Sequence, residues 1–313
     1  MAGWAGVTWD SWRDHGEIRA RLDAGADPDA WEGGSPLHRA AGFGTPEVVA
    51  ELARRVTDVD APEHGTTALW EAVAQHRPDN ARALAAAGAD PWRPQLGGWS
   101  PGRLALAGPT PDLFPAPASE PGLTEAEQAT ARRGRQLVRA LGVFPHEGTG
   151  LACIAGIDAA EAIRLLDAHP ADEDLMADFL DDPDEYDWDE GLLIAGVTTV
   201  PGGCIVTQPW GYTPSTPGVL TRLTVGTFGY GFYANPKSGN QGSIARNGTV
   251  EAHDLHPGGG PDQGDSPSEV LTAYLYRHHP VAHACAFAGL HPTDPRPVTG
   301  PADTWIQLPD LDY

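Results

Sequence analysis

The chain has 313 residues, more than one hydrophobic core usually serves, so its length predicts two domains. Its 43 acidic residues outnumber 20 basic ones, and the formal net charge is −23. Such a surface repels phosphate backbones and anionic lipids, so the charge argues against a nucleic-acid partner and against a membrane partner.

Residue usage and the first residues indicate the setting of the chain. Lys237 is the only lysine among abundant Arg, Ala, Gly and Pro, which is typical of a GC-rich coding sequence and suggests a high-GC bacterium. Cys153, Cys204 and Cys285 form no CxxC pair, so we expect reduced thiols. The N-terminus lacks a signal-peptide pattern and no run of 18 apolar residues occurs, so we expect a cytoplasmic protein.

A short phrase recurs three times in the first third of the chain. It stands at residues 33–38 (GGSPLH), 65–70 (GTTALW) and 98–103 (GWSPGR), with its Ser or Thr at 35, 67 and 100. A period of 32 and then 33 residues predicts stacked helical repeats, because one such unit cannot bury its apolar face alone.

Each phrase has the chemistry of a helix start. The Ser or Thr hydroxyl caps free backbone N–H groups, and a following proline fits the first helical position. In the first full unit, Ser35 is the expected cap, and Pro46 opens a second, antiparallel helix to Leu52. The second unit repeats this logic from Thr67, with its second helix over residues 80–87.

These segments resemble the ankyrin repeat family, whose units begin with Gly-x-Thr-Pro-Leu-His and end in Gly-Ala-Asp. The match is close at 33–38 and 86–91, and residues 14–29 look like the back half of a capping unit. Gly102-Arg103 depart from the pattern, which indicates a degenerate or truncated last repeat. The resemblance implies recognition through turn tips and the exposed faces of the first helices. The residues at those positions, which we predict to bind a protein partner, are Trp31, Glu32, Arg39, Phe43, Glu63, His64, Trp70, Glu71, Gln75, Trp92 and Arg93. Packing against the next repeat or the second domain is the alternative, above all for Trp70 and Trp92.

The repeat pattern ends after Leu106. Five prolines between 108 and 122 predict a stiff, extended linker, and Thr124 with Glu127 forms a capping box for a helix from about 125 to about 141. The predicted domains are therefore a repeat array at 1–107, a linker at 108–122 and a second domain at 123–313.

The second domain is predicted to be α+β, with an antiparallel sheet packed with helices. We expect helices over 157–168, 266–277 and 281–290, hairpins over 192–208 and 244–250, and a strand over 220–234. In this order of elements, residues 140–290 are similar to a bacterial domain family of unknown function, and that resemblance implies no activity.

Candidate chemistry in the second domain is sparse, and we predict no catalytic residues, metal or cofactor. His279 and His283 have the spacing of a zinc pair, but a third ligand and the HExxH glutamate are missing. The glycine-rich run 226–231 lacks the following helix that a phosphate loop needs, so we expect strand glycines. Cys153 with a distant histidine stays open as a nucleophile, but no local Cys-His signature supports it.

An acidic run extends from Asp172 to Glu190 with eleven carboxylates and no basic residue. It is either a partner-binding acidic surface, represented by Asp182, Asp184, Asp187 and Asp189, or a solvated loop; a calcium loop lacks the EF-hand glycine and terminal glutamate.

The first functional hypothesis is a non-catalytic protein-binding module with a basic partner, in one version an immunity or antitoxin protein. The alternative is an enzyme or small-molecule sensor in the C-terminal domain, with the array recruiting its substrate. A concave pocket with convergent His, Asp or Cys side chains would favour this alternative. A third hypothesis is an array whose surface is used up by internal packing.

Overall fold

The computed structural model describes residues 3–172, 176 and 191–309. The fold is α+β, with helical repeats followed by an antiparallel sheet covered by helices, as predicted. The chain divides into two compact units, one formed by 1–132 with 260–277 and the other by 133–259 with 278–313. The domain boundaries predicted at residues 107 and 122 stay a prediction. The sequence does not predict that residues 260–277 group with the repeats.

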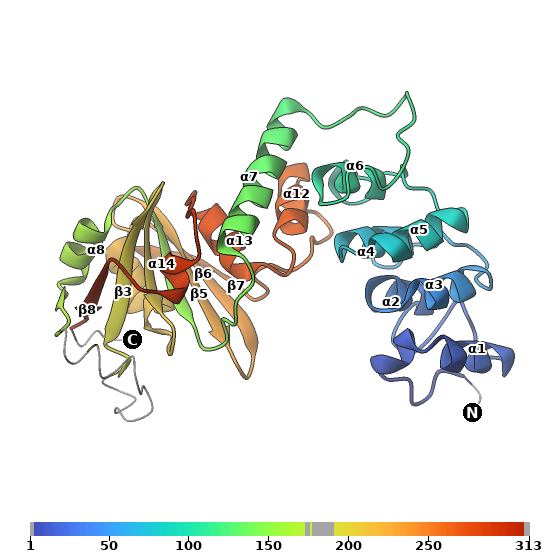
Figure 1. The fold of residues 1–313 in the computed structure, drawn as a ribbon, viewed down its shortest axis with the longest axis horizontal. Coiled ribbons are helices and arrows are strands. Elements are labelled where there is room, and N and C mark those ends of the chain that lie inside the picture. The colour runs from blue at the N-terminus through green and yellow to red at the C-terminus, as the bar shows by residue number, and fades with distance from the viewer. Residues whose placement is uncertain (1–2, 173–175, 177–190, 310–313) are drawn as a thin grey trace. The chain divides into compact units, whose positions relative to one another are not determined.

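The repeat unit consists of short helices in antiparallel pairs (Figure 1). In chain order they are η1 (Asp10–Arg13), α1 (His15–Asp23), α2 (Pro36–Phe43), α3 (Pro46–Ala53), α4 (Ala68–Ala74), α5 (Pro78–Ala86), η2 (Leu96–Gly98) and α6 (Pro101–Ala107). The predicted caps are confirmed. The hydroxyls of Ser35, Thr67 and Ser100 accept the backbone N–H three residues ahead, at 3.4, 3.2 and 3.2 Å.

Side chains tie each repeat to the next at matching positions. The backbone N–H of Ser35 donates to Glu63 at 2.9 Å, and that of Thr67 donates to Gln95 at 2.8 Å, so the same bond recurs one repeat later. Asn80 is 3% exposed, and its amide donates to the carbonyls of Ala41 at 2.9 Å and Gly44 at 3.1 Å. These carbonyls belong to the end of α2, where helix geometry leaves them without an intrahelical donor.

The last repeat is completed by a distant piece of chain. Helix α6 is followed by residues 108–122, which contain no helix or strand, and then by α7 (Glu125–Leu141). Helix α12 (Pro267–Leu275) lies beside α6 (Figure 1), and the Trp99 indole donates to the Pro267 carbonyl at 2.8 Å. Gly108 stands against the Tyr274 hydroxyl, where a side chain would collide. Helix α12 therefore covers the end that a further repeat would occupy.

The second unit is built on one eight-stranded sheet. The strands are β1 (Gly150–Ala155), β2 (His169–Pro170), β3 (Ile194–Val200), β4 (Gly203–Gln208), β5 (Phe228–Asn235), β6 (Gly239–Arg246), β7 (Thr249–Asp254) and β8 (Thr304–Gln307). Their order is β2-β8-β3-β4-β1-β5-β6-β7, and every pairing is antiparallel. Both predicted hairpins are confirmed, with the turns at Pro201-Gly202 and Asn247-Gly248.

Helices cover both faces of this sheet. One face packs on α8 (Ala159–Leu166), η4 (Thr213–Ser215) and α11 (Pro217–Leu223), around a core that includes Ile154, Val206 and Leu220. The opposite face packs on α13 (Pro280–Phe287) and α14 (Arg296–Thr299). The predicted helices over 157–168, 266–277 and 281–290 are present as α8, α12 and α13.

The predicted strand over 220–234 is wrong in its first part. Residues 217–223 form α11, because Pro217 fits the first helical turn and Val219, Leu220 and Leu223 share one buried helical face. The strand begins at Phe228. Gly229 and Gly231 are strand glycines, as predicted, whereas Gly226 lies in the preceding turn with a φ of 74°. Gly231 leaves room for Leu220 of α11.

Candidate protein-binding surface

A cluster of three aromatic side chains and one arginine lies in the N-terminal part of the repeat unit. The Trp9 ring meets Phe43 edge to face at 4.9 Å between centroids, and the Arg39 guanidinium lies 5.3 Å from the Trp9 ring and 6.0 Å from the Trp31 ring. Trp9 remains 61% exposed. We call Trp9, Trp31, Arg39 and Phe43 the aromatic–arginine cluster, and three of its four members were predicted from the sequence.

The cluster is held in place by the local fold. The Trp31 backbone pairs with Gly34 in a turn bridge, and its ring lies over Gly33, which has no side chain to obstruct it. Arg39 projects from α2, where its guanidinium donates to the Gly33 carbonyl at 3.2 Å. The local fold therefore positions the Trp31 ring and the Arg39 guanidinium before a partner binds, and such preorganisation lowers the entropic cost of binding.

A polar cleft of about 630 Å³ lies further along the same unit. It is lined by His64, Trp70 and Glu71 from the second repeat, and by residues of the 260–263 segment together with Arg277. Trp70 is only 2% exposed, so its ring is packed inside the repeat unit, as the alternative to partner binding predicted. Gln75, also predicted, is buried and donates to Glu71 at 2.8 Å.

The remaining predicted residues are spread over the turn tips. Glu32 and Arg93 are exposed, and Arg93 donates to the Asp60 carbonyl at 3.2 Å. The Glu63 carboxylate accepts the backbone N–H of Ser35 in the preceding repeat, so it already stabilises the repeat stack in the free protein. Trp92 is half-buried with its ring against Gly102, which explains why glycine replaces the expected leucine in the third phrase.

These stacked pairs, with their capped first helices and recurring inter-repeat bonds, have a known counterpart. Residues 14–95 match the ankyrin repeats in three copies. A comparison with curated proteins finds no match for the chain. Ankyrin repeats are protein-interaction modules, so this part of the chain has the architecture of a surface that binds another protein. The similarity of residues 140–290 to a bacterial family of unknown function stays a prediction.

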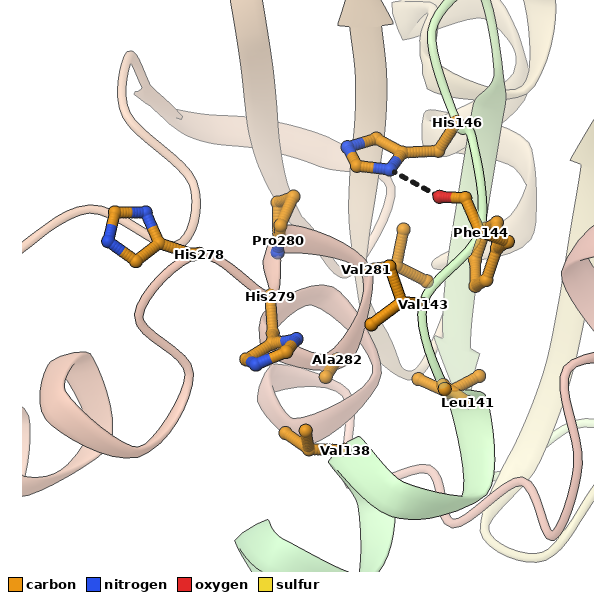
Figure 2. Close-up of a pocket in the computed structure, with 11 residues that line it drawn as sticks. Val138, Leu141, Val143, Phe144, His146, His278, His279, Pro280, Val281 and Ala282 are labelled. Carbon is orange, nitrogen blue, oxygen red and sulfur yellow. Dashed lines mark hydrogen bonds between the residues drawn. The ribbon is translucent and has the colours of Figure 1, made fainter. Parts of the chain in front are cut away.

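The candidate metal pair does not gather a metal site in the part of the chain that the structure describes. Figure 2 shows that His278, His279 and His146 do not converge, and His146 is hydrogen-bonded to the Phe144 carbonyl. His283 packs against Tyr230 at 5.5 Å between ring centroids. Burial lowers the pKa of both His279 and His283. Within the described ranges, no group of three or more His, Cys, Asp or Glu side chains is placed to hold an ion.

The structure describes only some of the other candidate residues. Asp182, Asp184, Asp187 and Asp189 lie outside the described residues, so the acidic surface stays a prediction. Cys153 is fully buried beside Cys285, with 3.9 Å between the sulfur atoms, and the neighbouring thiol and burial raise the pKa of Cys153 well above its usual value. A protonated, enclosed thiol is a poor nucleophile. No described helix is both long and apolar enough to span a bilayer.

Two features of this surface are not predicted by the sequence. Trp9 lies before the first repeat, where no repeat phrase marks it, and only its neighbours in space reveal its place in the cluster. The lining of the cleft by 260–263 and Arg277 depends on chain that follows almost two hundred residues later. Neither has a local signal in the sequence.

Proposed function

We propose that this chain is a non-catalytic protein-binding module whose partner docks on the aromatic–arginine cluster. The carrying observation is the exposed Trp9 side chain, which meets the Phe43 ring edge to face and lies beside the Arg39 guanidinium on a repeat surface. Tryptophan and arginine are the residue types that most often dominate binding energy in protein interfaces. Because the turn at Trp31 and the bond from Arg39 to Gly33 position two of these side chains, a partner has fewer side chains to order when it binds.

The partner that fits best is a basic protein. The net charge of −23 attracts cations over a long range, and the acidic Glu32 and Glu71 lie among the predicted contact residues near the cluster and the cleft. A bacterial, cytoplasmic immunity or antitoxin role, in which the chain covers the active site of a cationic toxin, is one concrete form of this proposal. The same charge supports the absence of nucleic-acid and membrane partners.

Site-specific photo-crosslinking in the expressing cells tests the docking site. p-Benzoylphenylalanine replaces Trp9 in one variant and Arg82 in the control, because Arg82 is an exposed residue of α5 whose guanidinium pairs with Asp79 at 2.8 Å. We expect a single crosslinked protein of defined mass from position 9 and none from position 82. Equal products from both positions, or none from position 9, would reject the proposed docking site.

Ionic strength tests the charge of the partner separately. If the captured protein is basic, its association with the chain weakens steeply as salt rises from low to physiological concentration, because screening shortens the reach of surface charges to about 8 Å. If the affinity of the captured protein does not change with salt, the proposed docking site stands but the proposal of a basic partner is refuted.

A further inference from the structure

A second concave site lies in the sheet unit, apart from the repeats. Its volume is about 510 Å³, within the range of small-molecule sites. Strands β5, β6 and β7 form its floor, and the segment around η4 forms its wall. Nothing in the proposed protein-binding function uses this pocket.

The strand register shows which side chains face the pocket. Tyr233 pairs with Gln241, and Ser243 pairs with His253, so these four side chains lie on one face of the sheet. Tyr212 lies on that face too, because its ring meets Tyr233 at 5.7 Å between centroids.

Asp254 also borders the pocket, but its carboxylate is engaged elsewhere. It alternates to the opposite face, where it accepts the Tyr230 hydroxyl at 2.7 Å, and Tyr230 in turn packs against α13. Gly242 leaves the space through which the Tyr230 hydroxyl reaches it. The side chains that face the pocket therefore carry no carboxylate.

The polar groups of the pocket are hydroxyls, amides and an imidazole. Ser243 and His253 are hydrogen-bonded at 3.2 Å. The side-chain oxygen of Asn235 accepts the Lys237 backbone N–H at 2.8 Å, so the amide N–H groups of Asn235 remain as donors for a ligand. The amide nitrogen of Gln241 donates to Ser238 at 3.2 Å, so its oxygen remains as an acceptor. No lysine or arginine is among the described residues that line the site.

This chemistry selects a class of ligand. An anion finds no positive side chain, and a cation finds no carboxylate on the pocket face. A ligand with several hydroxyl groups both donates and accepts, which matches amide, hydroxyl and imidazole groups together. The C–H groups of a sugar ring pack on aromatic rings, and the two tyrosines provide such rings beside their own hydroxyls. We propose that this pocket binds a neutral saccharide.

The residues that line the site all belong to the sheet unit, and saccharide binding gives that unit a sensing role. A saccharide titration of the full chain therefore needs no docking partner.

Saturation-transfer NMR and calorimetry on the full chain test the proposal with glucose, N-acetylglucosamine, maltose and cellobiose as probes. We expect at least one of the four to bind. Gln241→Ala weakens that binding by about 3- to 10-fold, since it removes one or two hydrogen bonds, and Tyr233→Ala weakens it by at least about tenfold. Gln136→Ala, an exposed glutamine of α7, is the matched control and leaves affinity within about twofold.

Three results would overturn the inference. They are absence of binding by all four saccharides, equal affinity in the Gln241→Ala and Gln136→Ala variants, and tighter binding of glucose 6-phosphate or spermidine than of the neutral sugars. Circular dichroism establishes that each variant is folded. If Tyr233→Ala unfolds, the comparison of the two glutamine variants decides the question, because both residues are exposed.

Discussion

Replacement of Asn80 tests how the repeats are joined. The Asn80 amide has two protons, and its shorter bonds go to the carbonyls of Ala41 and Gly44 at 2.9 and 3.1 Å. Each hydrogen bond contributes about 0.5–1.5 kcal/mol net, so Asn80→Ala is expected to lower the free energy of unfolding of the repeat unit by about 1–3 kcal/mol. The site is buried, so water cannot easily replace the lost donor.

The isosteric change Asn80→Asp separates this hydrogen-bond argument from simple loss of volume. Aspartate keeps the shape but places a carboxylate oxygen against carbonyl oxygens, so Asn80→Asp is expected to destabilise more than Asn80→Ala at neutral pH. Arg82→Ala, on the exposed side of the same helix, is expected to stay within about 0.5 kcal/mol of the native chain.

Urea unfolding followed by circular dichroism measures these differences, and hydrogen exchange of the α2 and α5 amides assigns them to the repeat unit. The assignment matters because a chain of two units need not unfold in one step. The reasoning fails if Asn80→Asp is as stable as the native chain, or if it is no less stable than Asn80→Ala.

Two further predictions concern the end of the array and alkaline pH. Trp99→Phe removes the bond to Pro267 and part of a side chain that is 1% exposed; we expect faster hydrogen exchange at 267–275 with the strands unchanged, and unaltered exchange there would refute docking of α12 through Trp99. Burial raises the pKa of Cys204 from 9.0 to about 12, so above pH 9 the unfolded chain loses a proton that the folded chain keeps. Stability is therefore fully present below pH 9 and falls toward pH 12, by up to about 1.4 kcal/mol per pH unit, and Cys204→Ala is expected to reduce that slope in urea titrations at each pH. An unchanged slope would contradict the assignment to Cys204.

The repeats were predictable because their signals are local. A hydroxyl, a proline and an apolar stripe within a few residues specify each first helix, and the caps at Ser35, Thr67 and Ser100 follow directly. The same holds for the Asn247-Gly248 hairpin.

Features that depend on distant partners were not predictable. Helix α12 meets Trp99 across 168 positions of the chain, and no residue near either end announces that contact. The helix over 217–223 is different, because Pro217 and the spacing of Val219, Leu220 and Leu223 are local helix signals that the predicted strand over 220–234 passed over. The saccharide pocket depends on the pairing of Ser243 with His253, which needs the register and not only the strands.

The central claim is that the aromatic–arginine cluster binds a protein partner, and the affinity of the crosslinked partner tests it most directly. Isothermal titration calorimetry compares the native chain with two matched variants. Arg39→Ala removes an arginine side chain of the cluster, and Arg82→Ala removes an exposed one of helix α5. The account predicts at least about a tenfold weaker Kd for Arg39→Ala and a change within about twofold for Arg82→Ala. Equal affinities for the two variants, both folded by circular dichroism, would contradict it.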